Sequence, residues 1–437
     1  MRAQRLRIAW FSDLALGKEQ SVSGYCSREL LPRLAQEHCI ELFSESFSRS
    51  ELGLPHHHYL NAYKRHESEP FDIFFYQLED GRSSRFVRGH IGLMPGVVWV
   101  HDLFCKDLGP EACHTSPWET TIRQYLDGDQ PFADRLVAPH QLWPRVYREV
   151  SLSPVVLCSS RWAYNEFLRM TSNRLEASDG AHSAQVLPIP VSARRNHSHG
   201  RVLNPEMLSI ACNSVSGIEG RAHKFLPVLK KMPGAWRLVW MLDSDEISSA
   251  QALVREFGIS EQRVSFVSPR SPDAWGEVVK DSDVALHLHT STFGHLAPYL
   301  QLTMAEGCPA IVAQSGQGED IPNNVAFHII PGVHESAQIE AVLEAVRKNG
   351  RDALGGEGMR YISASADSAD IARTLSAGFR RWAPQLREVM QRWQELQRRA
   401  QRELLGEVRH LVCDKSAATP DPFDVSLLPS IKELGWA

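Results

Sequence analysis

The sequence predicts an α/β protein with two successive parallel-sheet domains and a C-terminal helical extension. Three observations predict it. Short apolar runs alternate with helical segments, this alternation is interrupted once by a polar segment and then restarts, and the last part of the chain is helical throughout. Runs that are apolar on both faces are typical of parallel sheets covered by helices on both sides. The 437 residues suffice for two or three domains of about 100–200 residues each.

Composition excludes several classes of protein. A net charge of -5, from 47 basic and 52 acidic side chains, argues against a nucleic-acid-binding protein, which normally needs a basic face. No apolar run approaches the ~18 residues of a membrane span, and the apolar start is too short for a signal peptide. The eight cysteines are scattered without any C-x-x-C pair, which suggests reduced thiols in a cytoplasmic protein.

The first domain is expected over residues 1–195. Its expected strands are residues 6–11, 40–43, 71–76, 96–100 and 155–158, and its expected helices include residues 27–36 and 161–168. In the first of these helices, Leu30, Leu31 and Leu34 recur at helical spacing. Strands and helices in this order are typical of a Rossmann-like domain.

A polar segment at residues 192–205 is interpreted as the linker, and a second Rossmann-like domain is expected over residues 205–370. Its expected strands are residues 208–212, 237–242, 264–267, 284–288 and 310–313, with helices at residues 248–257 and 297–305. Residues 371–437 are expected to form C-terminal helices and a tail. Two such sheets in tandem place the default ligand site in the cleft between them, near the carboxyl ends of their strands.

Several stretches resemble the retaining GT-B glycosyltransferases of family 4. Residues 71–78 read FDIFFYQL and residues 95–103 read PGVVWVHDL, where that family typically reads "yD…YQLGN" and "PGvvvLHD". The other matching stretches are residues 8–12, 23–31, 156–163 and 283–312. Together they span about residues 6–375. The resemblance implies the GT-B fold, in which two Rossmann-like domains face each other across a cleft.

The resemblance also implies a function. Such an enzyme moves a sugar, typically a hexose, from a nucleotide diphosphate sugar to a hydroxyl of a glycan, lipid or other acceptor, with retention of configuration. It needs no metal or other cofactor. Polysaccharide or glycoconjugate biosynthesis is the expected context, in the cytoplasm, with peripheral contact at the inner face of a membrane left open.

Departures from the family pattern keep alternatives open. The family usually has a Glu after the donor-segment glycine and a second Glu eight positions on, where this chain has His295 and Thr303. The "QLGN" element reads Gln77-Leu78-Glu79-Asp80. A catalytically degenerate binding or scaffolding subunit is therefore the alternative function. A sugar-nucleotide epimerase of the same fold is a third hypothesis, which only His101-Asp102 supports.

The donor diphosphate needs amide groups at a helix N-terminus and a nearby cation. The resemblance places the donor-binding candidates at Gly217, Arg221, Lys224, Phe266, Val267, Gly294, Leu296, Ala297 and Asp320. Lys224 and Arg221 would supply the cation, and the alternative is that both are ordinary surface residues. Backbone near Phe266 would meet the base. Asp320 either faces the donor or serves only as a turn residue.

Two histidines are the catalytic candidates. His295 either hydrogen-bonds the donor or is a remnant in an inactive site. His101 follows a strand and is expected to face the cleft, with Asp102 beside it on the acceptor side. Gly24 and Tyr25 are expected to form a flexible lip that approaches the donor.

Two further patterns are discounted. The triplet at residues 56–58 is three histidines, but adjacent histidines rarely converge on one ion, so a solvated loop is expected and no metal is predicted. Cys105 and Cys113 lack a Cys-His-Asn arrangement and are not predicted to be nucleophiles.

Overall fold

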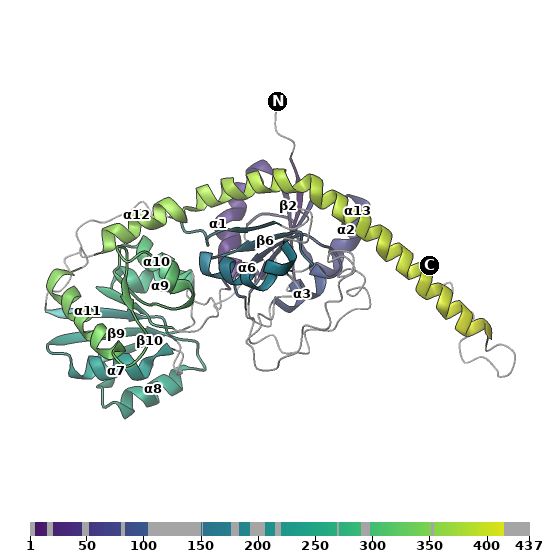
Figure 1. Cartoon of the computed structure of the whole chain (residues 1–437). Helices are drawn as coiled ribbons and strands as arrows, with labels where there is room; N and C mark the ends of the chain where they lie inside the picture. Colours follow the sequence, from purple (N-terminus) through teal and green to yellow (C-terminus); the bar gives the residue numbers. More distant parts are fainter. Residues whose placement is uncertain are drawn as a thin grey trace.

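The computed structural model describes residues 5–14, 21–45, 52–79, 84–103, 150, 152–175, 183–192, 206–214, 220–268, 271–289, 298–350 and 354–414. These residues form two α/β domains, and a long helix from the end of the chain returns to the first of them (Figure 1). No helix in these ranges is long and apolar enough to cross a membrane.

The first domain has a seven-stranded parallel sheet in the order β3-β2-β1-β4-β5-β6-β7. Its strands are β1 (Arg7–Phe11), β2 (Cys39–Ser44), β3 (His56–His58), β4 (Ile73–Leu78), β5 (Val97–Val100), β6 (Val155–Cys158) and β7 (Ser183–Val186). Its helices are α1 (Val22–Glu37), α2 (Ala62–Ser68), α3 (Arg85–Ile91) and α6 (Arg161–Leu175), with a 3-10 turn, η1, at Tyr59–Asn61.

Both faces of this sheet are buried, because successive residues of a strand point to opposite sides. On β1, Trp10 packs into a cluster with α1, whereas Phe11 packs into a second cluster with α2, α3 and α6. Trp10 stacks on Phe75 of β4 with ring centroids 4.2 Å apart. The apolar runs of the sequence therefore form a sheet covered on both sides, as predicted.

The second domain has a six-stranded parallel sheet in the order β10-β9-β8-β11-β12-β13. Its strands are β8 (Met207–Cys212), β9 (Ala235–Met241), β10 (Val264–Val267), β11 (Val284–His287), β12 (Ala310–Ala313) and β13 (Phe327–Ile329). Its helices are α7 (Ala222–Lys231), α8 (Ile247–Glu256), α9 (Pro272–Lys280), α10 (Tyr299–Ala305), α11 (Glu335–Asn349) and α12 (Gly355–Ser365), with 3-10 turns η6 (Glu261–Arg263) and η7 (Gly316–Asp320).

The C-terminal helix α13 (Ser368–Asp414) packs on the first domain and then runs beyond it (Figure 1). Its residues Phe379 and Trp382 lie in the same apolar cluster as α1, and Trp393 lies in the cluster on the opposite face of the sheet. The indole of Trp393 donates to the carbonyl oxygen of Leu93 at 2.7 Å. The extension predicted beyond residue 371 is therefore, in its first half, part of the first domain's core.

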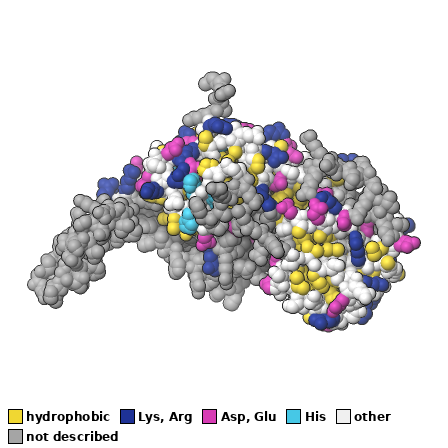
Figure 2. Space-filling view, turned by 180° about the vertical axis from the view of Figure 1, so that it is seen from behind, with side chains coloured by type: hydrophobic (Ala, Val, Ile, Leu, Met, Phe, Trp, Pro, Cys, Tyr) yellow, Lys and Arg dark blue, Asp and Glu magenta, His cyan; other side chains and the backbone are white. Residues whose placement is uncertain are grey.

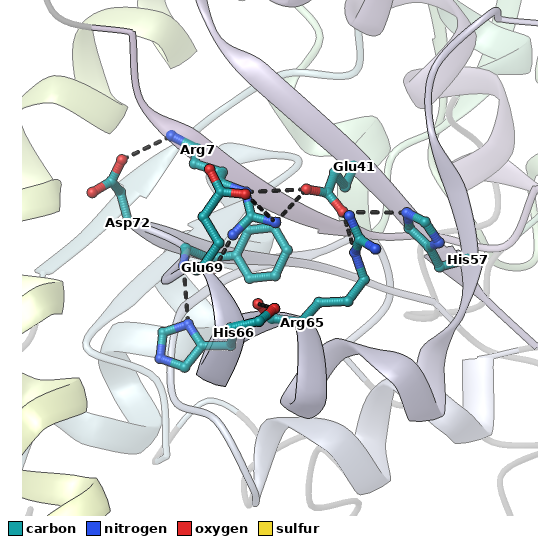
Figure 3. A network of polar contacts seen from close by, with 9 residues as sticks. Arg7, Glu41, His57, Arg65, His66, Glu69 and Asp72 are labelled. Atoms are coloured by element: carbon teal, nitrogen blue, oxygen red, sulfur yellow. Dashed lines mark hydrogen bonds and ion pairs between the residues drawn. The ribbon is translucent and has the colours of Figure 1, made fainter.

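A polar network joins β1, β2 and the edge strand β3 of the first sheet to α2 (Figure 3). Glu41 of β2 accepts hydrogen bonds from Arg7 of β1, at 3.0 Å, and from Arg65 of α2, at 2.5 Å. His57 of β3 lies 3.2 Å from the same carboxylate. Burial opposes ionisation of Glu41, but the two guanidinium groups outweigh it and hold its pKa below the ordinary value. The network fixes the sheet edge through paired charges.

The structure corrects two local predictions. His56–His58 was expected as a solvated loop but forms β3, because its backbone pairs in register with Leu42–Ser44 of β2. Helix α1 begins at Val22, five residues before the expected start, because the Ser21 hydroxyl accepts from the amide of Gly24 and caps it.

The surface carries mixed charge. On the described part of the face in Figure 2, Lys and Arg side chains are interspersed with Asp and Glu side chains. This distribution agrees with the nearly balanced composition, because neither sign of charge forms an extended surface on this face.

Candidate functional site

Both sheets have a topological switch point, where consecutive connections leave a strand pair in opposite directions. In the first sheet it lies between β1 and β4, and in the second between β8 and β11. Ligands of open α/β sheets bind outside the carboxyl ends of the strands at such points. The residues that follow these four strands are therefore the starting point for the site.

Contacts between the domains come from the carboxyl ends of the two sheets. The carboxylate of Asp320, on η7 after β12, accepts a 2.7 Å hydrogen bond from the amide of Trp162, at the start of α6 after β6. Arg28 of α1 lies 3.6 Å from Asp273, at the start of α9 after β10. Elements that follow strand ends in one domain thus meet elements that follow strand ends in the other, so the two switch points lie on facing sides.

At the first switch point, Glu79 follows β4 and is buried against α1. Its carboxylate accepts from the hydroxyl of Ser23 at 2.5 Å and from the amide of Ser23 at 3.2 Å. Burial raises the pKa of Glu79 to about 7; the Ser23 hydroxyl opposes this rise and the nearby charge of Asp13 adds to it. The switch point therefore contains a carboxyl group that exchanges its proton near neutral pH.

His101, the catalytic candidate after β5, is 4% exposed, and both of its ring nitrogens have partners. Its Nε2 lies 2.8 Å from Oε1 of Gln77, and its Nδ1 lies 2.9 Å from the hydroxyl of Ser159. Because the Gln77 amide nitrogen donates to the carbonyl of Ser23 at 3.1 Å, its oxygen must accept from His101. His101 therefore carries its proton on Nε2, and burial lowers its pKa to about 3.

The predicted lip formed by Gly24 and Tyr25 is wrong. Both residues lie in the first turns of α1, and Tyr25 is 4% exposed. A side chain on Gly24 would approach the carbonyl oxygen of Asp13 to 2.8 Å, so glycine allows α1 to pack against the segment after β1. Asp102, the other acceptor-side candidate, is also 4% exposed.

In the second domain, the two cation candidates have different surroundings. Arg221 caps α7 in the left-handed conformation, with φ 60°, and its guanidinium is paired with the carboxylate of Glu335 on α11. Lys224 lies in the first turn of α7, is partly exposed, and has its carbonyl oxygen bound by the hydroxyl of Ser336. No ion pair engages Lys224 among the described residues, whereas the charge of Arg221 is compensated by Glu335.

Thr303 is fully buried in α10. Its hydroxyl oxygen lies 2.9 Å from Nε2 of His287 on β11 and accepts from the indole of Trp275 at 2.9 Å. The hydroxyl of Thr303 therefore links α10 to α9 and β11 in the interior of the second domain.

Sequence reasoning missed Asn213 and Ser214, which follow β8 directly at the second switch point. Asn213 is 1% exposed and Ser214 is fully buried. Nδ2 and Oδ1 of Asn213 and Oγ of Ser214 have no hydrogen-bond partner in the described structure. The signal that could have found them is two polar residues immediately after an apolar strand.

The other donor-binding candidates fall into two groups. Phe266 and Val267 lie on β10, where the ring of Phe266 contacts Trp240 with centroids 6.1 Å apart. Gly217, Gly294, His295, Leu296 and Ala297 lie outside the described residues. Within the described ranges, no group of three or more His, Cys, Asp or Glu side chains could hold a metal ion.

Replacing Asp320 by alanine is expected to loosen the contact between the domains, because its carboxylate caps α6 of the other domain. Loss of such a cap costs about 1 kcal/mol. Denaturant unfolding and small-angle scattering should show lower stability and a larger radius of gyration. Asp320→Asn keeps an acceptor oxygen and should resemble the parent protein. Equal scattering profiles for Asp320→Ala and the parent protein would rule out a role in domain closure.

Comparison with known proteins supports the fold. No family model matches the sequence, and no curated protein matches it. Among solved structures, HepE of Anabaena in complex with UDP and glucose is 12% identical, with a TM-score of 0.57 over 86% of this chain and 99% of that one. Sucrose-phosphate synthase of Thermosynechococcus elongatus is 13% identical, with a TM-score of 0.58 over 86% and 99%. A glycosyltransferase of Rickettsia africae is 11% identical, with a TM-score of 0.56 over 90% and 98%. This chain therefore has the GT-B fold that its sequence predicts.

Proposed function

We propose that this protein is a glycosyltransferase that moves a sugar from a nucleotide diphosphate sugar to a hydroxyl of a glycan, lipid or other acceptor. The observation that carries the proposal is the pair of switch points on facing sides of two domains, one with buried carboxyl and hydroxyl groups and the other with a helix N-terminus and Lys224. Structurally similar proteins include one solved with UDP-glucose, which supports a nucleotide sugar as the donor.

The chemistry follows from what the residues can do. The amides at the start of α7 and the ammonium of Lys224 stabilise negative charge on the departing diphosphate. His101 has a depressed pKa and two occupied nitrogens, so it does not deliver a proton at neutral pH. It is a positioning residue that orients Gln77 and Ser159.

The finer parts of the proposal come from the family resemblance. They are a hexose as the transferred sugar, retention of configuration without a metal or other cofactor, and a role in polysaccharide or glycoconjugate biosynthesis. The proposed location is the cytoplasm or the inner face of its membrane. Analysis of the product anomer tests retention directly.

Lys224→Ala is expected to weaken binding of a nucleoside diphosphate by about 10- to 100-fold, because one charge-assisted contact contributes roughly 1.5–3 kcal/mol. Calorimetric titration with UDP, GDP and ADP provides the measurement. The matched control is Lys231→Ala, which removes an exposed charge from the other end of the same helix. Equal affinities for Lys224→Ala and the parent protein would remove Lys224 from the site.

The second candidate function is a binding or scaffolding subunit that has lost catalysis. Two observations favour it: the aligned position of a family Glu is occupied by a buried Thr303, and the charge of Arg221 is compensated by Glu335. Donor hydrolysis by the purified protein distinguishes the two functions. Binding of a nucleotide sugar without hydrolysis or transfer would favour the second.

A further inference from the structure

The backbone of Asn213 and Ser214 is held by hydrogen bonds to neighbouring elements. The amide of Asn213 donates to the carbonyl of Leu286 on β11 at 3.3 Å. The carbonyl of Ser214 accepts from the indole of Trp240 at 2.6 Å. These bonds hold the two residues at the end of β8, so the positions of their side chains follow from the fold.

The side chain of Asn213 points to the face of the sheet that α9 and α10 cover. Side chains alternate along a strand, and Cys212 belongs to the cluster beneath α7, whereas Ala211 belongs to the cluster with α9 and α10. Asn213 therefore lies on the Ala211 side. His287, the residue of β11 next in register, lies on that side too and contacts Trp275 of α9. Asn213 thus belongs to a layer of buried polar groups at the carboxyl end of the sheet.

The buried side chains of Asn213 and Ser214 have unused hydrogen-bonding capacity among the described residues. Buried polar atoms in folded proteins are almost always hydrogen-bonded, because an unpaired one costs the free energy of its lost hydration. Here three such atoms are unpaired in two consecutive residues of the described chain. All three lie at the switch point, directly after β8. Within the described residues, the end of β8 therefore has buried polar groups without a hydrogen-bond partner.

The chemistry of these atoms identifies the ligand group. A carboxamide offers one acceptor and two donated hydrogens, and a hydroxyl offers one donor and accepts as well. Neither side chain carries a charge. A phosphate has only acceptors, whereas ring hydroxyls both donate and accept. We infer that Asn213 and Ser214 bind hydroxyl groups of a sugar ring in the ligand; this inference rests on the proposed function.

Two rings of a nucleotide sugar have suitable hydroxyls, namely the ribose and the transferred sugar. The experiment uses Asn213→Leu, which keeps the branching of the side chain and removes its polar atoms, and Ser214→Ala. UDP, 2′-deoxy-UDP and UDP-glucose serve as probes by calorimetry, or the corresponding GDP or ADP series if thermal shifts show that the parent protein prefers that base. Each variant is expected to bind its nucleotide sugar at least 10-fold more weakly than the parent protein.

The probes separate the two rings. The contact is with the ribose if the variants already bind UDP more weakly than the parent protein does, and if they bind UDP and 2′-deoxy-UDP with equal affinity. The contact is with the transferred sugar if the variants lose affinity for UDP-glucose but not for UDP. Binding equal to that of the parent protein with all probes would overturn the inference. A parent protein that binds no nucleotide at all would instead count against the proposed function.

The stability of the free protein gives an independent readout. Ser214→Ala removes a hydroxyl oxygen that has no partner among the described residues, so it should leave the melting temperature unchanged or raise it. The control is Ser209→Ala on the same strand, whose hydroxyl accepts from Arg237, so that it should lower the melting temperature and leave binding unchanged. A large fall in melting temperature for Ser214→Ala would show that the residue has a structural partner and would overturn the inference.

Discussion

Arg221→Ala is expected to lower the free energy of unfolding by about 3–5 kcal/mol, the usual range for removing one partner of a buried ion pair. The loss is large because Glu335 remains, with a side chain only 1% exposed and its charge unpaired. The sequence interpretation of Arg221 as a donor-binding residue predicts a different result, namely weaker nucleotide binding with little change in stability. Urea denaturation and calorimetric titration of the same variant distinguish the two.

Two controls separate the contributions to this result. Arg221 has a positive φ, so alanine adds backbone strain that glycine does not; the difference between Arg221→Gly and Arg221→Ala measures it. Glu335→Gln should cost less than Arg221→Ala, because the arginine side chain is 16% exposed and can reach water. The double variant should lose less than the sum of the single losses. An additive result would show that the pair does not contribute through its charges.

Glu79→Gln is expected to change how stability depends on pH. Burial raises the pKa of Glu79 from 4.5 to about 7, so between these values the unfolded chain has released a proton that the folded protein retains. Stability of the parent protein therefore falls as pH rises through this window, by up to about 3 kcal/mol. The variant lacks this titration, so its stability relative to the parent protein should increase from pH 5 to pH 8.

Urea denaturation at several pH values between 5 and 8 provides the measurement. Glu340→Gln is the matched control, because it makes the same change of charge at an exposed position and should give a curve parallel to that of the parent protein. If the stability of Glu79→Gln also changes with pH in parallel with that of the parent protein, Glu79 is ionised throughout this range and Ser23 compensates for its burial.

Apolar runs in the sequence identified most strands, because a buried strand needs only a short stretch of consecutive apolar residues. The run from Ile8 to Phe11 is apolar and buried at every position, and such a run needs cover on both faces of the sheet. The histidine triplet at residues 56–58 failed as a prediction because its strand is defined by pairing with β2 and has no buried face of its own. Tertiary context overrode composition there.

The candidate site was less predictable than the fold. Lys224 could be proposed as a cation candidate because it follows the expected strand at residues 208–212, where the resembling family has a basic residue. The engagement of Arg221 could not be predicted, because Glu335 lies 114 residues away along the chain. The same holds for His101, whose tautomer depends on Gln77 and, through it, on a carbonyl of α1.

The sequence by itself determined that this protein has two parallel-sheet domains, because alternation of apolar runs and helical segments is a local property. The GT-B arrangement of the two domains was predicted only through the resemblance to a known family. Only the tertiary structure shows which polar groups of the described residues have partners within the fold and which do not. Hydrogen-bond pairing joins residues that are distant in sequence, as Glu29 and Ser368 show across 339 positions. For that reason Arg221 and His101 prove to have partners within the fold, and Asn213 and Ser214 become the residues to test.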